Sequence, residues 1–149
     1  MNKRKGITLA ELIVTLGVLT VILGVVFFVV SRRDGSHREI LATADQLMSD
    51  IRYARQRAIM EGEIIQIVFQ GSNGRYIIRY FSGLTVIREG YLPDSVWFVH
   101  NRDRFYHFRP RGTPSSGFSI YLRSAQHELT LSVVGSGGRV IRSEVREVG

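Results

Sequence analysis

The spacing of apolar residues changes twice along this chain. Residues 7–30 form an apolar run in which Glu11 is the sole charged residue. A helix over this run spans about 36 Å, more than the roughly 30 Å hydrocarbon core of a bilayer. We therefore expect residues 7–30 to cross a membrane, with the rest of the chain attached to that helix.

After a polar stretch at residues 31–36, apolar residues recur at three- and four-residue steps, as on one face of an amphipathic helix. These residues are Ile40, Leu41, Ala44, Leu47, Met48, Ile51, Ala54 and Ala58. We expect a helix over residues 36–61, with Ser36 as its N-cap, Glu39 as its capping-box partner and an end near Gly62. The polar stretch is expected to break or hinge the helix. The apolar face could pack on a sheet or pair with a partner helix.

The second change follows Gly62. There, apolar residues begin to alternate with polar ones, the two-residue repeat that is typical of β-strands. Turns rich in glycine, proline, asparagine and serine separate eight strand-like segments. They cover residues 63–70, 75–82, 84–91, 95–99, 104–109, 118–122, 129–133 and 139–148. Trp97 is flanked by Phe98 and Val99 and is expected to pack in the core. The predicted fold is α+β, with a long N-terminal helix packed on antiparallel β-sheet.

Composition sets limits on the remainder. A chain of 149 residues has room for one soluble domain of about 110 residues beyond the membrane helix. It contains no cysteine, so no disulfide can stabilise the domain. The formal charge is +7, and it falls to +4 without Lys3, Arg4 and Lys5. Basic residues flank the apolar run on both sides, so charge alone does not orient it.

Two ordinary interpretations of the N-terminus compete. A cleaved secretory signal has an apolar region of about 7–15 residues followed by a small-residue cleavage site. The run here is longer, and residues 29–33 contain no such site. A plain signal anchor fits the length but explains neither Gly6 nor Glu11.

Glu11 is costly in a bilayer unless it has a partner, because an uncompensated carboxylate there costs several kcal/mol. Cleavage after Gly6 would create an amine at Ile7, about one helical turn before Glu11. Between neighbouring copies of such a helix, Glu11 of one copy could pair with the terminal amine of another.

The sequence Gly-Ile-Thr-Leu-Ala-Glu-Leu-Ile at residues 6–13 resembles the class III signal of type IV prepilins and type II secretion pseudopilins. The resemblance implies cleavage between Gly6 and Ile7 by a prepilin peptidase, N-methylation of Ile7, and a role for Glu11 in assembly. Two features depart from the pattern: isoleucine replaces the usual phenylalanine at Ile7, and no proline interrupts the helix. The second departure favours a minor subunit.

The implied organisation has three parts: a leader at residues 1–6, a transmembrane and assembly helix at 7–30, and a pilin-like globular domain at 31–149. That domain would hold the amphipathic helix and a β-rich region at 63–149. The implied location is the cytoplasmic (inner) membrane, crossed once, with the domain on the extracytoplasmic side. Other pseudopilins or pilins, the prepilin peptidase and the inner-membrane assembly platform are the implied partners.

Shorter motifs resemble the GspH/FimT-type minor subunits. They are an arginine before an alanine-hydrophobe pair in residues 55–59, the turn Phe-Arg-Pro-Arg-Gly at 108–112, and Gly-Arg-Val at 138–140. Their order along the chain implies a minor pseudopilin or minor pilin at a filament tip or initiation site. An unclassified pseudopilin is the alternative. Arg52, Arg55 and Arg57 are expected to be solvated near the helix end.

Catalysis has little support. The four histidines are scattered without metal-ligand spacing, and neither a nucleophile elbow nor a phosphate-binding glycine motif occurs. We expect neither an enzyme, nor a cofactor, nor a metal site. An anchored enzyme with a scattered site is the alternative.

A DNA-binding minor pilin for natural transformation is the second functional hypothesis. Some FimT-type subunits resemble this chain and bind DNA through basic residues near a C-terminal glycine-arginine motif. The candidates here are Arg109, Arg111, Arg139, Arg142 and Arg146. Against it, Glu144 and Glu147 lie in the same final segment, and Arg139 and Arg142 are three residues apart, so they point to opposite faces of a strand.

Overall fold

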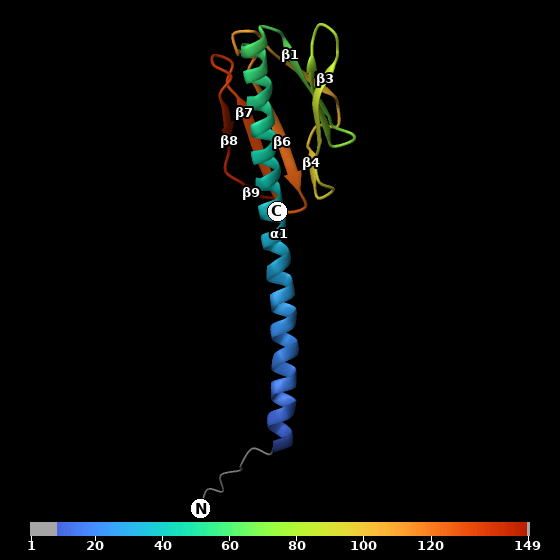
Figure 1. Ribbon diagram of the computed structural model, residues 1–149. Helices are drawn as coiled ribbons and strands as arrows, with labels where there is room; N and C mark the ends of the chain where they lie inside the picture. Colours follow the sequence, from blue (N-terminus) through green and yellow to red (C-terminus); the bar gives the residue numbers. More distant parts are fainter. Residues whose placement is uncertain (1–8, 149) are drawn as a thin grey trace, which may run out of the picture. The chain divides into compact units, whose positions relative to one another are not determined.

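The computed structural model describes residues 9–148, apart from the side chains of residues 29–34. Helix α1, Leu9–Glu61, is followed by nine strands (Figure 1). The chain divides after Gly35 into two units, residues 1–35 and 36–149. The second unit contains all of the β-structure and the last part of α1.

Helix α1 is continuous through residues 31–36, so the expected break is absent. The prediction that Ser36 caps a separate helix is therefore wrong. Propagating an existing helix adds a hydrogen bond for each residue fixed, which offsets the cost of about 1 kcal/mol for Gly35. The hydroxyl of Ser36 instead donates to Ser124 Oγ at 3.2 Å. The predicted end is confirmed, since α1 stops at Glu61 and Gly62 has the left-handed φ of +68°.

The apolar face of residues 36–61 packs on both sheets rather than on a partner helix. Six of its side chains are at most 1% exposed: Ile40, Ala44, Leu47, Ile51, Ala54 and Ala58. They share one core cluster with apolar residues from both sheets. Figure 1 shows this part of α1 lying across β6 and β7. The predicted face is confirmed.

The first sheet has the strand order β3-β2-β1-β5, with antiparallel pairs. Its strands are β1 Ile65–Gln70, β2 Arg75–Tyr80, β3 Val86–Tyr91 and β5 Arg104–Phe108. The second sheet has the order β4-β6-β7-β8, and β9 also pairs with β7. Its strands are β4 Val96–Phe98, β6 Phe118–Ser124, β7 His127–Val133, β8 Val140–Arg142 and β9 Arg146–Glu147. The α+β prediction is confirmed.

Aromatic contacts join the two sheets. The ring of Tyr106 on β5 stacks on Phe118 of β6 with centroids 3.8 Å apart, and Phe69 of β1 meets Phe98 of β4 at 5.6 Å. Along β6 and β7 alternate side chains are buried, as expected for sheets with one face on the core.

Two sequence expectations differ from the structure. The last predicted strand, residues 139–148, is two short strands, β8 and β9. Trp97 is 42% exposed, because its neighbours Val96 and Phe98 occupy the inward positions of β4 and successive side chains alternate across a strand. The prediction that Trp97 packs in the core is wrong.

Candidate functional site

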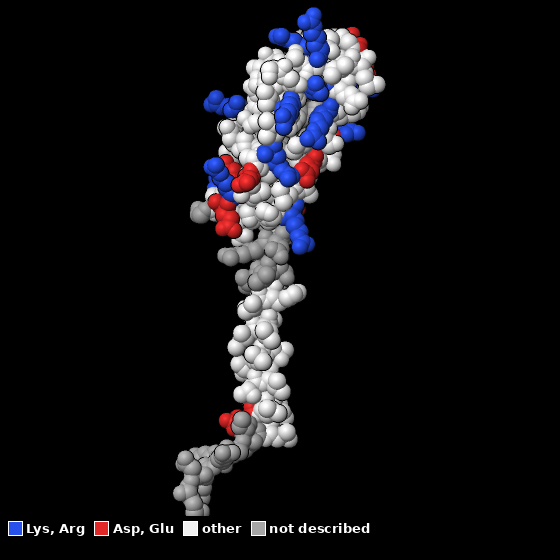
Figure 2. Space-filling view, turned by 90° about the vertical axis from the view of Figure 1, so that its left-hand side faces the viewer, with Lys and Arg blue, Asp and Glu red and all other residues white. Residues whose placement is uncertain are grey.

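The candidate membrane segment is the first part of α1. The 20-residue segment Leu9–Phe28 is long and apolar enough to span a bilayer, and none of it is buried. In Figure 2 its surface is uncharged except for acidic atoms at its beginning. A helix that exposes apolar side chains on all sides is typical of a membrane span rather than of a soluble helix.

The threonines of this segment satisfy their own hydroxyl groups. Thr15 Oγ1 donates to the carbonyl oxygens of Glu11 and Leu12, each at 2.9 Å, and Thr20 Oγ1 donates to the carbonyl of Leu16 at 2.8 Å. Such bonds to the preceding helical turn remove the cost of placing a hydroxyl in hydrocarbon. The segment is therefore suited to lipid despite its threonines.

Glu11 lies in the first turn of α1 and is exposed. Glu11 is thus the charged residue on the outside of an otherwise apolar helical segment, and its predicted role in assembly stays a prediction. Gly6 and Ile7, the predicted processing residues, lie outside the described residues, so cleavage between them stays a prediction.

In the globular unit, three segments that are far apart in the sequence meet beside the end of α1. Arg55 Nε donates to the carbonyl oxygen of Gly112 at 3.0 Å. A Cβ added to Gly138 would lie 2.6 Å from that same oxygen and 3.0 Å from the Arg55 side chain. Gly112 and Gly138 both have positive φ, +75° and +64°. Each of the three segments carries one of the GspH/FimT-like motifs, so these motifs form one contact site, the Arg55 junction.

The candidate arginines divide between two places. Arg109, Arg111 and Arg139 are exposed and lie within three residues of Gly112 or Gly138. They take part in none of the ion pairs between described side chains. Arg142 is elsewhere: it lies on β8, and its guanidinium pairs with Asp45 of α1. The structure therefore brings three of the five candidate arginines to the Arg55 junction, whereas Arg142 on β8 and Arg146 on β9 lie on the short strands that pair with β7.

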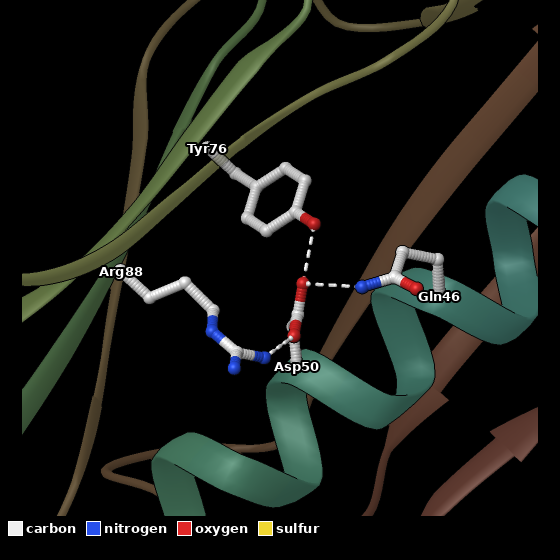
Figure 3. Close-up of polar contacts among 4 residues, drawn as sticks. All are labelled: Gln46, Asp50, Tyr76 and Arg88. Atoms are coloured by element: carbon white, nitrogen blue, oxygen red, sulfur yellow. Dashed lines mark hydrogen bonds and ion pairs between the residues drawn. The ribbon is translucent and has the colours of Figure 1, made fainter.

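A buried carboxylate connects α1 to the first sheet (Figure 3). Asp50, 2% exposed, accepts hydrogen bonds from Tyr76 of β2 at 2.5 Å, from Arg88 of β3 at 2.5 Å and from Gln46 at 3.2 Å. The Arg88 guanidinium also lies 4.5 Å from the ring centroid of Tyr53. A buried charge is tolerated when it is paired and hydrogen-bonded, and these contacts meet that condition.

Burial and the neighbouring Asp50 carboxylate raise the pKa of Tyr76 above its ordinary value of 10.0. Its hydroxyl therefore stays protonated and continues to donate over the physiological pH range. The ring of Tyr76 lies over Gly90 on β3, where an added Cβ would come within 2.3 Å of the ring. Gly90 is needed for this close approach.

The sequence reasoning missed the Asp50 cluster. The available signal was position: Asp50 lies three residues after Leu47 and four before Ala54, on the apolar face of the helix. Arg55 was expected to be solvated, but its partner is 57 residues away and no local pattern reveals it. Among the described side chains, no group of three or more His, Cys, Asp or Glu is placed to hold a metal ion.

Two protein-family models match the chain. The model described as type II transport protein GspH matches residues 43–138, which include Asp50, Arg55, Gly112 and Gly138. The model described as the prokaryotic N-terminal methylation motif matches residues 1–27. No curated protein sequence matches.

Solved structures share the fold. The type IV minor pilin FimU of Pseudomonas aeruginosa, strain PAO1, has a TM-score of 0.61 at 15% identity, covering 72% of this chain and 90% of that chain. A second crystal form of FimU gives 0.58 at 14% identity, with 70% and 92% covered. The minor pseudopilin EpsH from the type 2 secretion system of Vibrio cholerae gives 0.55 at 8% identity, with 74% and 96% covered.

Proposed function

Because this chain belongs to the GspH family of minor pseudopilins and pilins, we propose that it is a membrane-anchored structural subunit at the tip or initiation site of a filament. The filament is a type II secretion pseudopilus or a type IV pilus. Proteins of this family are structural subunits, and the pseudopilins among them assemble with other pseudopilins.

One observation carries the proposal. The N-terminal methylation motif coincides with the first segment of α1, Leu9–Phe28, whose apolar side chains are all exposed and which bears one carboxylate, Glu11. The globular unit completes its own core without these side chains. Segment Leu9–Phe28 is therefore available to two environments in turn, the bilayer before assembly and the helices of neighbouring subunits afterwards.

Processing precedes assembly in this proposal. Prepilin peptidase cleaves between Gly6 and Ile7 and the new N-terminal amine is methylated. The chain then crosses the cytoplasmic membrane once, with its globular unit on the extracytoplasmic side. The methylated amine of Ile7 pairs with Glu11 of a neighbouring subunit, and the inner-membrane assembly platform extracts the helix into the filament.

Mass spectrometry of the mature protein tests the processing step. The expected N-terminal residue is a methylated Ile7, and a chain that retains Lys3, Arg4 and Lys5 contradicts it. The variant Glu11→Ala is expected to be cleaved and anchored but to fail in filament assembly. Thr15→Ala, one turn along the helix, serves as the control with normal assembly. Normal filaments from Glu11→Ala would remove the role of Glu11.

A deletion strain assayed for both protein secretion and pilus formation identifies the machine. Loss of one activity with the other intact assigns the subunit to the pseudopilus or to the pilus. The same strain, complemented with the variants above, shows whether Glu11 acts in that machine.

DNA capture is the second candidate, and one observation favours it. Arg109, Arg111 and Arg139 gather at the Arg55 junction without acidic partners among the described side chains. Phosphate binding by such a cluster weakens steeply with salt. The full chain in neutral lipid nanodiscs is expected to retard duplex DNA at low salt, and Arg111→Gln with Arg139→Gln to abolish the shift. Arg142→Gln is the control, because Arg142 already pairs with Asp45. Absence of a shift at low salt removes this candidate.

A further inference from the structure

One end of the globular unit exposes large apolar side chains beside unpaired arginines. This end, here called the Gly62 end, is where α1 stops. It consists of residues 59–64, the β2–β3 turn at 81–86, the loop at 109–117 and the turn at 134–139. Ile65 of β1 pairs with both Tyr80 and Phe108, which places the first three segments together. The contact between Gly138 and Gly112 adds the fourth.

The Gly62 end exposes a set of five large apolar side chains, Ile59, Met60, Ile64, Phe81 and Leu84. Met60 is 73% exposed and Leu84 is 56% exposed. The carbonyl oxygen of Ile64 accepts a hydrogen bond from the Phe81 backbone amide at 2.9 Å, so these two exposed residues are neighbours, and the Phe81 ring also makes an edge contact with the His107 ring. Ile59 continues the set towards Gly112, since a Cβ there would lie 2.5 Å from its side chain. Exposed apolar sets of this size on soluble domains usually mark a binding surface.

Leu84 supplies an independent observation. Its φ is +54°, and among the described residues it is the one non-glycine with positive φ. That conformation costs of order 1–3 kcal/mol for a residue with a Cβ, and glycine or asparagine would adopt it more readily. A large exposed apolar side chain therefore sits at a strained backbone position in the turn between β2 and β3. Strained positions of this kind are concentrated at sites of function.

The charges at the same end are mainly positive. Arg109, Arg111 and Arg139 are exposed and unpaired, as described above. Glu61 is compensated by Arg57 at 2.8 Å and by the hydroxyl of Tyr80 at 2.7 Å. Glu63 is the remaining exposed acid. Arginines, drawn in blue, predominate over the upper part of the globular unit in Figure 2.

We propose that the Gly62 end binds an anionic phospholipid surface. Protruding apolar tips next to arginines are what an interfacial site requires, because the tips enter the acyl boundary while the arginines lie at the headgroup phosphates. Nucleic acid would use the arginines but leave the five apolar side chains unexplained. A protein partner would need a matching shape, whereas a bilayer accommodates side chains presented by separate turns.

The full chain is inserted into phosphatidylcholine nanodiscs. The binding of these nanodiscs to supported bilayers is then measured by surface plasmon resonance. Binding is expected to bilayers with 30% phosphatidylglycerol and not to pure phosphatidylcholine, and to weaken with salt. Arg111→Gln and Arg139→Gln are each expected to lower binding about fivefold, since each cation near an anionic surface contributes about 1 kcal/mol. The pair Met60→Gln and Leu84→Asn is expected to lower it at least tenfold. Asparagine retains the turn, because it tolerates positive φ.

Matched controls lie elsewhere on the same unit. Val99→Thr removes an exposed apolar side chain and Arg102→Gln an exposed arginine, and both are expected to leave binding unchanged. No binding, or equal binding to the two lipids, overturns the proposal. Loss with the arginine variants but not with Met60→Gln and Leu84→Asn also overturns it and favours a nucleic acid or acidic protein partner. The assay needs neither cleavage nor a filament, so its outcome is independent of the proposed assembly role.

Discussion

Residues 9–28 and 36–61 belong to one helix, yet their apolar side chains are stabilised in different ways. In the first segment the apolar side chains surround the helix and every one is exposed. In the second they form a single face that is covered by two sheets, with Ala44 and Ala54 fully buried. The backbone conformation is the same in both.

The difference shows what the apolar pattern encodes. A continuous run specifies a helix that needs apolar surroundings on all sides, which only lipid or other helices supply. A face at three- and four-residue steps specifies a helix with one side for the core and one for water. Substitutions should therefore affect the folding of the globular unit only in the second segment.

The largest expected contrast is between two leucines of α1. Leu47→Ala removes a side chain that is 1% exposed and should lower the free energy of unfolding of the globular unit by about 3 kcal/mol. Leu19→Ala, at a position 52% exposed, should change it by less than about 0.5 kcal/mol. Denaturant titration with fluorescence detection separates them, because Trp97 is the sole tryptophan and lies in the globular unit. A similar loss from both variants would mean that the two segments share one core.

The second contrast uses two glycines. Gly138→Ala places a Cβ 2.6 Å from the Gly112 carbonyl oxygen at a positive φ, and should destabilise the globular unit by about 2 kcal/mol. Gly24→Ala meets nothing within 4 Å and should leave that stability unchanged. The same titration measures both. An unaffected Gly138→Ala would contradict the tight packing at the Arg55 junction.

The third contrast is a pH dependence confined to the second segment. The pKa of Tyr76 is raised in the folded state, so its contribution to stability is complete below pH 10 and is lost as the pH rises above that value. Between pH 10 and pH 11, wild type should lose about 1 kcal/mol more of its free energy of unfolding than Tyr76→Phe, because only part of the unfolded tyrosine is ionised at the lower pH. Parallel denaturant titrations at the two pH values test this. Equal losses of stability in the two proteins would show that ionisation of Tyr76 does not contribute to unfolding at alkaline pH.

The smallest expected effect concerns Arg142, which joins β8 to α1. Its ion pair with Asp45 is at the surface, where such pairs contribute about 0.5 kcal/mol. Arg142→Gln should lower stability by that amount at low salt and by less at 1 M salt. A loss of several kcal/mol would show that the last strands depend on this pair.

The helix and most strands could be predicted from the sequence, because the spacing of apolar residues within each element is a local property of the chain. Leu47, Ile51 and Ala54 are recognisable as one face without knowledge of what covers them. Successive side chains of β4 lie on opposite faces of the sheet, and the local sequence does not show which face is inward. Val96 and Phe98 are buried, so Trp97 lies on the outer face. Ser36 is not an N-cap, because α1 continues through it from the residues before it.

The candidate site was less accessible to sequence reasoning. Glu11 is identifiable, since a carboxylate in an apolar run is unusual wherever it occurs. Arg55 and Gly112 are 57 residues apart, and their contact depends on the whole topology of the unit. The exposure of Met60 and Leu84 likewise follows from which segments meet at the Gly62 end.

The Arg55 junction also bears on how the protein is made. Its last component, Gly138, is synthesised roughly 80 residues after the apolar face of α1 is complete at Ala58. At about 5–20 residues per second that interval lasts on the order of 4–16 s. Throughout it the second sheet, which packs on this face together with the first, lacks its last strands. We therefore expect the nascent domain to expose part of its apolar face, including Ile40, Leu47 and Ile51, until the last strands are synthesised.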